Sequence, residues 1–358
     1  MTTKCKVLSL GLLMVVLAGC TSIGPGSVSR DRFDYNASLT ESWKRQILLN
    51  IVKMRYVEPV FFVDVGQIVA GYSLETDVNA GGSATVSSFD TTSIQVGMAG
   101  KYTDRPTITY VPLTGNAFIK SLMTPFTPES MMSAIQAGMP ANMIFKLGVA
   151  SVNGLRNRSA PTTGFRPAER KFLRVVEIIR SLQVAGAISL RTIKDKDNQA
   201  STTISFWSKG APAEVSVQVR ELCDLLGLDP RAEQYRLVYN HLSDNNQEIA
   251  MQSFTLMQFL SFLAARVEVP GKDVSEGRAS PGVLEMRNTD DKEGFVVKCS
   301  DSKPQDAYAS VRYRNSWFWV DDRDLEAKRA ISFIMLVFTL ADTDKHESLP
   351  QITIPAQK

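Results

Sequence analysis

The feature that most constrains this chain is a stretch from residue 68 to residue 102 in which apolar and polar residues alternate. A period of two is the pattern of a β-strand, whose successive residues lie on opposite faces. The two alternating runs are separated by Ala80-Gly81-Gly82-Ser83 and a segment rich in serine and threonine, which is typical of a loop. The pattern therefore predicts a long β-hairpin, followed by another strand from Thr107 to Val111. The apolar positions of the two runs are Ile68, Ala70, Tyr72, Leu74 and Val78, and then Ile94, Val96, Met98 and Tyr102.

Helical patterns stand on both sides of this hairpin and recur through the rest of the chain. Ser38 and Glu41 have the spacing of a capping box, which predicts a helix that starts at Ser38 and ends before Pro59. A second helix is expected from Pro140 to Val152. Phe172, Val175, Val176, Ile179 and Leu182 form one apolar helix face.

Strand patterns are interleaved with these helices in an irregular order. A hairpin is expected from Tyr308 to Val320, and a helix from Asp322 to Ala341. The order lacks the regular alternation that a parallel sheet requires. It therefore predicts an α+β fold of mixed helices and antiparallel hairpins.

The first twenty residues carry the pattern of an export signal. Lys4 and Lys6 precede a short apolar run from Val7 to Leu17, and Leu17-Ala18-Gly19-Cys20 closes the segment. The apolar run is too short for a comfortable membrane span and has the layout of a secretory signal.

The Leu-Ala-Gly-Cys ending resembles the lipobox of bacterial lipoproteins. The resemblance covers only this leader. It implies cleavage before Cys20, with diacylglycerol on its thiol and an acyl chain, such as palmitate, on its new amino group. Thr21 is not the aspartate that favours inner-membrane retention in that family. The resemblance thus implies an outer-membrane protein, held by lipid and facing the periplasm.

These patterns suggest a division of the chain into four parts. Residues 1–19 are expected to be the signal peptide, and residues 20–37 a lipid-anchored tether. Residues 38–269 would form the main α+β domain. A polar loop over residues 270–281 would separate it from a C-terminal hairpin-and-helix subdomain, residues 282–358, packed on the main domain.

The charge balance limits the classes of partner. The formal net charge is +3, and removal of the leader with Lys4 and Lys6 leaves about +1. A nucleic-acid-binding domain is normally strongly basic, so no nucleic-acid partner is expected. The expected partners are the membrane, reached through the lipid, and envelope proteins or further copies of this chain.

Two cysteines, Cys223 and Cys299, would remain in the folded part once Cys5 is cleaved away and Cys20 is acylated. The periplasm is oxidising, so a disulfide between them is permitted. The alternative is two separate buried thiols, since free cysteine is among the most buried residue types. The sequence leaves both open.

A basic run suggests contact with an anionic surface such as lipid headgroups or a cell-wall polymer. The alternative is an ordinary solvated helix face. The candidate residues are Arg156, Arg158, Arg166, Arg170, Lys171 and Arg174.

No catalytic set, metal site or cofactor site is expected. His241 and His346 are the only histidines, and neither has a second ligand at zinc-binding spacing. His241 lies in a polar stretch and is expected to be an exposed turn residue rather than a general base. The acidic run Asp321-Asp322-Arg323-Asp324 lacks the spacing of a calcium loop and is expected to cap the helix that follows it.

Three functions follow as expectations. The first is a non-catalytic structural or assembly role in the cell envelope. The second is a subunit of an oligomeric outer-membrane export or pore complex that inserts the 68–102 hairpin. The third is an unrecognised envelope hydrolase, because a long chain can hold a site without a familiar motif.

Overall fold

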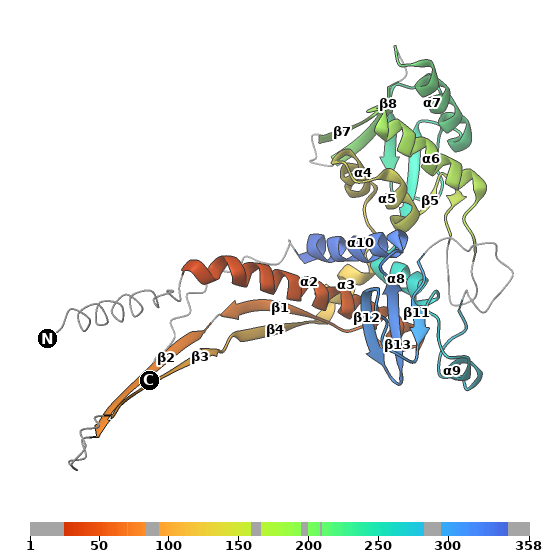
Figure 1. Cartoon of the computed structure of the whole chain (residues 1–358). Helices are drawn as coiled ribbons and strands as arrows, with labels where there is room; N and C mark the ends of the chain where they lie inside the picture. Colours follow the sequence, from red (N-terminus) through yellow and green to blue (C-terminus); the bar gives the residue numbers. More distant parts are fainter. Residues whose placement is uncertain are drawn as a thin grey trace, which may run out of the picture. The chain divides into compact units, whose positions relative to one another are not determined.

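The computed structural model describes residues 25–69, 71–83, 93–158, 166–194, 200–207, 210–282 and 295–342. It has an α+β fold, which confirms the prediction (Figure 1). The chain divides into two compact units. Unit 1 is the described part of Met1–Ser42 with Phe62–Leu113, and unit 2 is Trp43–Phe61 with the described part of Thr114–Lys358. The expected signal peptide and Cys20 lie outside the described residues.

Helix α2 (Pro25–Arg55) contributes residues to both units. The predicted helix start at Ser38 is wrong, and residues 25–37 of the expected tether are helical. Pro25 suits a first turn, where the missing N–H has no partner to lose. No proline or glycine follows Gly26 within the helix, so nothing in its sequence interrupts it. The part of α2 in unit 2 buries Ile47, Leu48, Ile51 and Val52.

Unit 1 contains a long antiparallel ribbon, defined here as residues 62–113. Strand β1 (Phe62–Val69) pairs with β4 (Thr107–Leu113), and β2 (Tyr72–Ser83) pairs with β3 (Ser93–Asp104). The predicted hairpin is confirmed, but its strands are longer than expected: Ala80-Gly81-Gly82-Ser83, expected in the loop, belongs to β2 and pairs with β3. The rest of the expected loop, residues 84–92, lies outside the described residues.

Gly66 lets the two strands β1 and β4 approach closely. The register shifts between Val65 and Gln67, and a Cβ atom at Gly66 would lie 2.8 Å from Cγ2 of Val111. A larger residue would have to displace Val111, so the glycine fits the bulge at this position.

Unit 2 is built around a six-stranded sheet with the order β6-β5-β10-β9-β8-β7. Strands β9 and β10 are parallel, and the other neighbouring strands are antiparallel. The predicted helix over 140–152 is wrong at its end, because residues 149–152 form β5 and pair with β10. The strands are β5 (Val149–Val152), β6 (Leu155–Arg156), β7 (Ile188–Lys194), β8 (Ala200–Phe206), β9 (Tyr235–Val238) and β10 (Glu248–Ser253).

Four helices lie in the same unit as this sheet: α4 (Pro128–Gln136), α5 (Ala141–Gly148), α6 (Arg170–Val184) and α7 (Ala213–Leu226). Helix α4 contacts β7, β9 and β10, and α6 packs against α5 and α7. The predicted apolar face of α6 is confirmed, since all five of its residues are buried.

A three-stranded sheet with the order β11-β13-β12 also belongs to unit 2. Its strands are β11 (Lys298–Ser300), β12 (Ala307–Tyr313) and β13 (Ser316–Asp321), and α10 (Leu325–Asp342) follows them. The predicted C-terminal hairpin and helix are thus confirmed. The remaining helices of the unit are α3 (Gly115–Met123), α8 (Leu256–Ala264) and α9 (Gly271–Ser275).

The expected separating loop, residues 270–281, contains α9, and the described residues on both sides of it belong to unit 2. The ribbon and the described part of Met1–Ser42 together form unit 1, and the remaining described residues form unit 2.

Candidate functional site

The ribbon is a two-stranded structure along its whole described length. The pairs β1–β4 and β2–β3 are each two-stranded sheets, so no further strand of the described chain covers their outer edges. On β4, Tyr110 is 63% exposed, Val111 43% and Ile108 38%. Unpaired strand edges present a row of backbone N–H and C=O groups to other chains.

The register of β2 and β3 divides their residues between two faces. Residues paired across an antiparallel ladder lie on the same face of the sheet. Leu74 pairs with Tyr102, and Val78 pairs with Met98. The intervening positions pair Glu75 with Lys101 and Asn79 with Gly97. The β2–β3 part of the ribbon thus has one face of mainly apolar positions and one of mainly polar or small positions.

Unit 2 contains a cavity of about 170 Å³ with a strongly basic lining, called the basic cavity below. Among the residues that the structure describes, its charged lining consists of four cations, Lys146, Arg158, Arg180 and Arg329, and one carboxylate, Glu326. They come from α5, the segment after β6, α6 and α10. The remaining lining is mostly apolar and consists of Pro140, Met143, Leu147, Phe262, Leu263, Phe295 and Ala330, with Asn142 as its uncharged polar member.

Two of these cations are held by neighbours that are not carboxylates. Arg180 Nη1 donates to Oε1 of Gln183 at 2.6 Å. The guanidinium of Arg158 lies 4.9 Å from the ring centre of Phe262, which is a cation–π distance. Both contacts orient the side chain.

Gln183 also fixes the backbone at the start of α5. Its Nε2 donates to the carbonyl oxygens of Ile135 and Met139, both at 2.7 Å, and its Oε1 accepts from the Ala141 N–H at 2.9 Å. The side chain that orients Arg180 therefore also positions the helix that carries Lys146.

Asn157 plays the matching role at the other end of α5. It is 1% exposed, and its Nδ2 donates to the carbonyl oxygens of Phe145, Lys146 and Val149 at 3.1, 3.1 and 2.7 Å. The next residue is Arg158, so this amide ties that arginine to the end of α5.

The basic residues predicted from the sequence do not form one surface. Of the six, only Arg158 lines the basic cavity. Arg174 is paired with Glu221 at 2.7 Å and with Glu177 at 3.0 Å, and its guanidinium lowers the pKa of Glu221. Arg166 donates to the carbonyl oxygen of Asn157 at 3.3 Å. Arg156, Arg170 and Lys171 are exposed and lie outside the cavity lining.

Two cavity cations, Lys146 and Arg329, were not among the predicted contact residues. They are far apart in the sequence and lie outside the basic run, so no local pattern associates them. Arg180 lies at the end of that run and is also not among the predicted contact residues.

Cys223 and Cys299 are both free thiols in this structure, which corresponds to the second of the two alternatives. Cys223 is buried, and its Sγ lies 3.3 Å from the hydroxyl of Tyr235. Cys299 is half-buried, and its N–H donates to Oε2 of Glu268 at 3.1 Å. Burial raises the pKa of both thiols, which disfavours the reactive thiolate.

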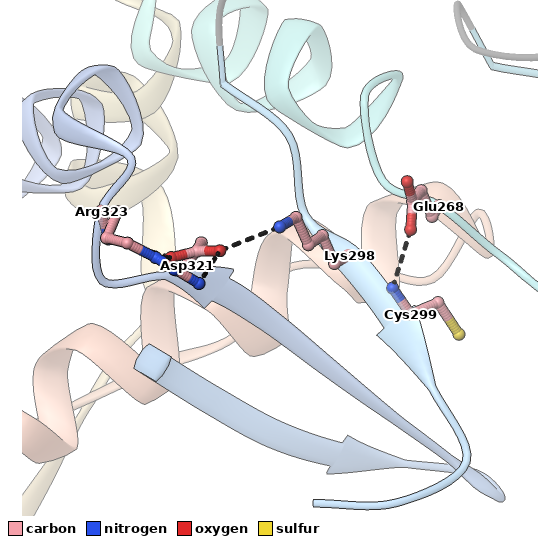
Figure 2. Close-up of polar contacts among 5 residues, drawn as sticks. All are labelled: Glu268, Lys298, Cys299, Asp321 and Arg323. Carbon is pink, nitrogen blue, oxygen red and sulfur yellow. Dashed lines mark hydrogen bonds and ion pairs between the residues drawn. The ribbon is translucent and has the colours of Figure 1, made fainter. Parts of the chain in front are cut away.

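The carboxylate of Asp321, at the end of β13, is paired with donors from the protein itself. Figure 2 shows Asp321 together with Lys298 and Arg323. Asp321 accepts from Nζ of Lys298 at 2.9 Å, and from the backbone N–H and Nε of Arg323 at 3.0 and 3.1 Å. These donors, the backbone N–H first, hold the pKa of Asp321 far below its usual range. The predicted acidic cap is confirmed at Asp324, whose Oδ1 accepts from the Ala327 N–H at 2.9 Å.

His241 makes a hydrogen bond with a serine. Its Nδ1 lies 2.9 Å from Oγ of Ser151, and the ring is half-buried, so the prediction of an exposed turn histidine is wrong. Ser151 is 2% exposed. A nucleophilic serine must reach its substrate, so the burial of Ser151 makes this pair a structural contact.

The described residues contain neither a membrane-spanning helix nor a metal-binding cluster. None of their helices is long and apolar enough to cross a membrane. In the same ranges, no group of three or more His, Cys, Asp and Glu residues could hold a metal ion.

No protein family, curated protein or solved structure matches this chain.

Proposed function

We propose that this protein is a lipid-anchored, non-catalytic assembly component of the bacterial outer membrane that faces the periplasm. The observation that carries the proposal is the ribbon, which extends over residues 62–113 as two-stranded sheets within the described chain. Through the ribbon the protein would pair with further copies of itself or with another envelope protein.

Physical chemistry supports this role for the ribbon. An isolated two-stranded hairpin is marginally stable in water, and three or more strands are normally needed. Long unpaired edges also favour addition of a strand from another chain, which satisfies the exposed backbone groups. Assembly through these edges would stabilise the ribbon.

Support for the anchor comes from the sequence Leu17-Ala18-Gly19-Cys20. Several acyl chains on one cysteine bind a membrane durably, whereas one chain binds only marginally. Mass spectrometry of the mature N-terminal peptide should find an acylated Cys20. An unmodified cysteine, or a chain that still starts at Met1, would contradict the anchor.

The second candidate is a subunit of an oligomeric outer-membrane export or pore complex. The register favours it, because apolar pairs such as Val78 with Met98 share one face of the ribbon. Strands β2 and β3 each have 12 residues, and a transmembrane strand needs roughly 9–11. Open edges cannot face lipid, so insertion would require a closed ring of ribbons.

A paired deletion tests assembly. Removal of residues 76–81 together with residues 95–100 takes out six paired positions, from Thr76–Gly100 to Gly81–Gln95. Because the number is even, the remaining positions keep their faces. In mild detergent, light scattering of the full chain should show an oligomer, and the shortened variant should be shifted toward the monomer. A wild-type chain that stays monomeric over the whole concentration range would rule out self-assembly. Pull-down with envelope extract would then test whether the ribbon pairs with another envelope protein.

A matched pair of substitutions separates assembly in water from insertion in lipid. Val78 and Asn79 are neighbours on opposite faces of the ribbon, so Val78→Asp and Asn79→Asp add the same charge to different faces. A charge on the lipid-facing side of a transmembrane strand is destabilising. If the ribbon inserts, the wild type and Asn79→Asp should release dye from lipid vesicles, and Val78→Asp should not. Oligomers without dye release in any of the three would exclude the pore.

A further inference from the structure

We propose that copies of this protein join head to tail, with the outer edge of β3 in one copy pairing with the outer edge of β2 in the next. The partner of the ribbon is thus a second copy of the chain, in a ring that uses both edges of every copy. The observations are the uninterrupted register of β2 with β3 and the unequal division of charge between these two strands. The inference rests on the proposed assembly through the ribbon and specifies which strands meet.

The β2–β3 part of the ribbon suits the addition of a strand better than the β1–β4 part. All 12 positions of β2 pair with β3 without a register shift, and neither strand contains proline. The β1–β4 ladder shifts its register between Val65 and Gln67, and Pro112 within β4 has no N–H to donate. Bulges and prolines obstruct the pairing of a strand edge with another chain. We therefore place the contact between copies on β2 and β3.

The charged positions of one face are divided between these two strands. The odd-numbered positions of β2 and β3 share this face, because Ser73 pairs with Thr103 and every second pair follows. Its acidic positions, Glu75 and Asp77, both lie on β2, and its basic position, Lys101, lies on β3. Opposite charges on neighbouring strands stabilise a sheet, and like charges destabilise it. The β2 strand of one copy is therefore complementary to the β3 strand of another.

Pairing of β2 with β2 of another copy would bring like charges together. In an antiparallel pair that keeps the faces and overlaps the two strands as fully as possible, the two copies of Asp77 lie directly opposite each other or on a diagonal. Pairing of β3 with β3 avoids this conflict but leaves the β2 edge of both copies open. Neither contact between like strands therefore uses both edges favourably.

Pairing of β3 with β2 of the next copy places opposite charges together. Copies in a ring have the same orientation, so this contact is antiparallel, as in the hairpin itself. In the register of the hairpin, Lys101 would lie opposite Glu75 of the next copy, and a shift of two residues would place it opposite Asp77. A shift of two residues in the other direction would place it opposite Ser73 and diagonal to Glu75. All three registers keep the two faces, because each shift is an even number.

A head-to-tail contact also accounts for both edges of the hairpin. Every copy offers one β3 edge and one β2 edge, so the contact repeats from copy to copy and ends only when the ring closes. In the closed ring no β2 or β3 edge is left open, and the backbone groups of both edges are paired.

Disulfide formation between copies distinguishes the possible contacts. In a ring, the same position in successive copies is two strands away, roughly 9–10 Å. A disulfide requires Cα atoms within about 7 Å of each other. A cysteine on β2 should therefore fail to pair with itself and should pair with a cysteine on β3 of the neighbouring copy.

The test uses the full-length chain with Cys5→Ser and Cys20→Ser, purified in mild detergent. Two single-cysteine variants with different affinity tags are produced together, so that mixed oligomers form. The chain that keeps only the native Cys223 and Cys299 is the control for disulfides that do not involve the ribbon.

Asn79→Cys supplies the thiol on β2 in every mixture. Its partner carries Gln95→Cys, Gly97→Cys or Ala99→Cys on β3, and these three partners correspond to the three registers above. On mild oxidation, one of the three mixtures should give a dimer with both tags, and Asn79→Cys alone should give none.

The outcomes separate this contact from the assembly on which it rests. A disulfide in the Asn79→Cys chain alone would show that β2 meets β2, and an oligomer in which no mixture cross-links would place the contact elsewhere. Either result would overturn the head-to-tail contact and leave assembly through the ribbon intact. A wild-type chain that stays monomeric would refute self-assembly and this contact together.

An exchange of charges tests the complementarity independently. Lys101→Glu makes the charged positions of the polar face acidic only, and Glu75→Lys combined with Asp77→Lys makes them basic only. Each variant alone should need a roughly tenfold higher concentration to assemble, because like charges then meet between copies.

A mixture of these two charge variants should assemble at a lower concentration than either alone. In the mixture β3 of one variant meets β2 of the other with opposite charges, while the like charges within each hairpin are unchanged. Any damage to the hairpin itself is therefore the same in the mixture and in the separate variants. A mixture that assembles no better than the separate variants would overturn the proposal.

Discussion

The hydroxyl of Tyr56 donates a hydrogen bond of 2.6 Å to Oδ2 of Asp273 and thereby joins the end of α2 to α9. Tyr56 is 6% exposed, and burial is the main cause that raises the pKa of its hydroxyl. The guanidinium of Arg314 lies 4.4 Å from the centre of its ring, and the ring of Tyr313 packs at 5.2 Å. The contact connects segments that are more than two hundred residues apart.

Tyr56→Phe should therefore lower the free energy of unfolding by about 1.5–3 kcal/mol, the range for a hydrogen bond to a charged group. Urea unfolding followed by circular dichroism measures it. Tyr308→Phe is the control, because the Tyr308 ring contacts Lys44 and Lys328 while its hydroxyl has no hydrogen-bond partner in the described chain. Equal effects of the two changes would show that the bond to Asp273 contributes nothing specific.

Asn157→Ala should lower the free energy of unfolding by about 1–3 kcal/mol, because it leaves carbonyl oxygens at the end of α5 without their donor. Asn157→Asp has nearly the same shape but no donor, so it should be at least as destabilising. Differential scanning calorimetry of both variants checks the prediction. A stable Asp variant would show that the shape of residue 157, rather than its amide donor, is what matters.

Both folded-state thiols should be free and slow to react. In a full-length background with Cys5→Ser and Cys20→Ser, denatured and unreduced protein should titrate as two thiols. In the native protein alkylation should be slow at neutral pH and should accelerate as pH rises beyond the usual thiol pKa of about 8.5, because burial raises both pKa values. Cys223, which is buried, should react more slowly than half-buried Cys299. Fewer than two thiols would mean that a disulfide forms after all.

Asp321 should contribute stability that disappears in acid. Its folded-state pKa is lowered, so the ionised form favours the folded chain above the unfolded-state pKa of about 3.9, and this contribution is lost as pH falls below that value. Asp321→Asn should therefore lower the melting temperature at pH 7, and the difference from wild type should shrink below about pH 4. Asp301→Asn, at an exposed position without an ion pair in the described chain, should show neither effect. A difference that stays constant with pH would contradict the role of the charge.

Several elements could be predicted because their own residues carry the pattern. The ribbon follows from a period of two, and α6 follows from the spacing of Phe172, Val175 and Ile179, since in both cases burial or pairing repeats with the geometry of the element. Asp324 could be assigned as a cap because capping is a local interaction.

Other elements depend on partners that the local sequence does not reveal. Val149–Val152 continues a helical run in the sequence but forms a strand, because β10, about a hundred residues later, pairs with it. Ser38 and Glu41 have capping-box spacing, yet the helix already begins at Pro25, so the motif lies within it.

The basic cavity shows the same limit for the site. Arg158 could be chosen from a dense basic run, whereas Lys146 and Arg329 are brought to it only by the packing of α5 and α10. A single sequence contains no information on that convergence. The predicted surface therefore shares only one residue with the cavity.

The continuity of α2 has a mechanical consequence. A helix of 31 residues is about 46 Å long and has no slack. If the chain is anchored just before this helix, a pull on the anchor acts along a stiff rod instead of stretching a loose linker. The load then reaches Ile47, Leu48 and Ile51, which are buried at the far end of the helix. Tension between membrane and protein would thus be borne by the hydrophobic core of unit 2.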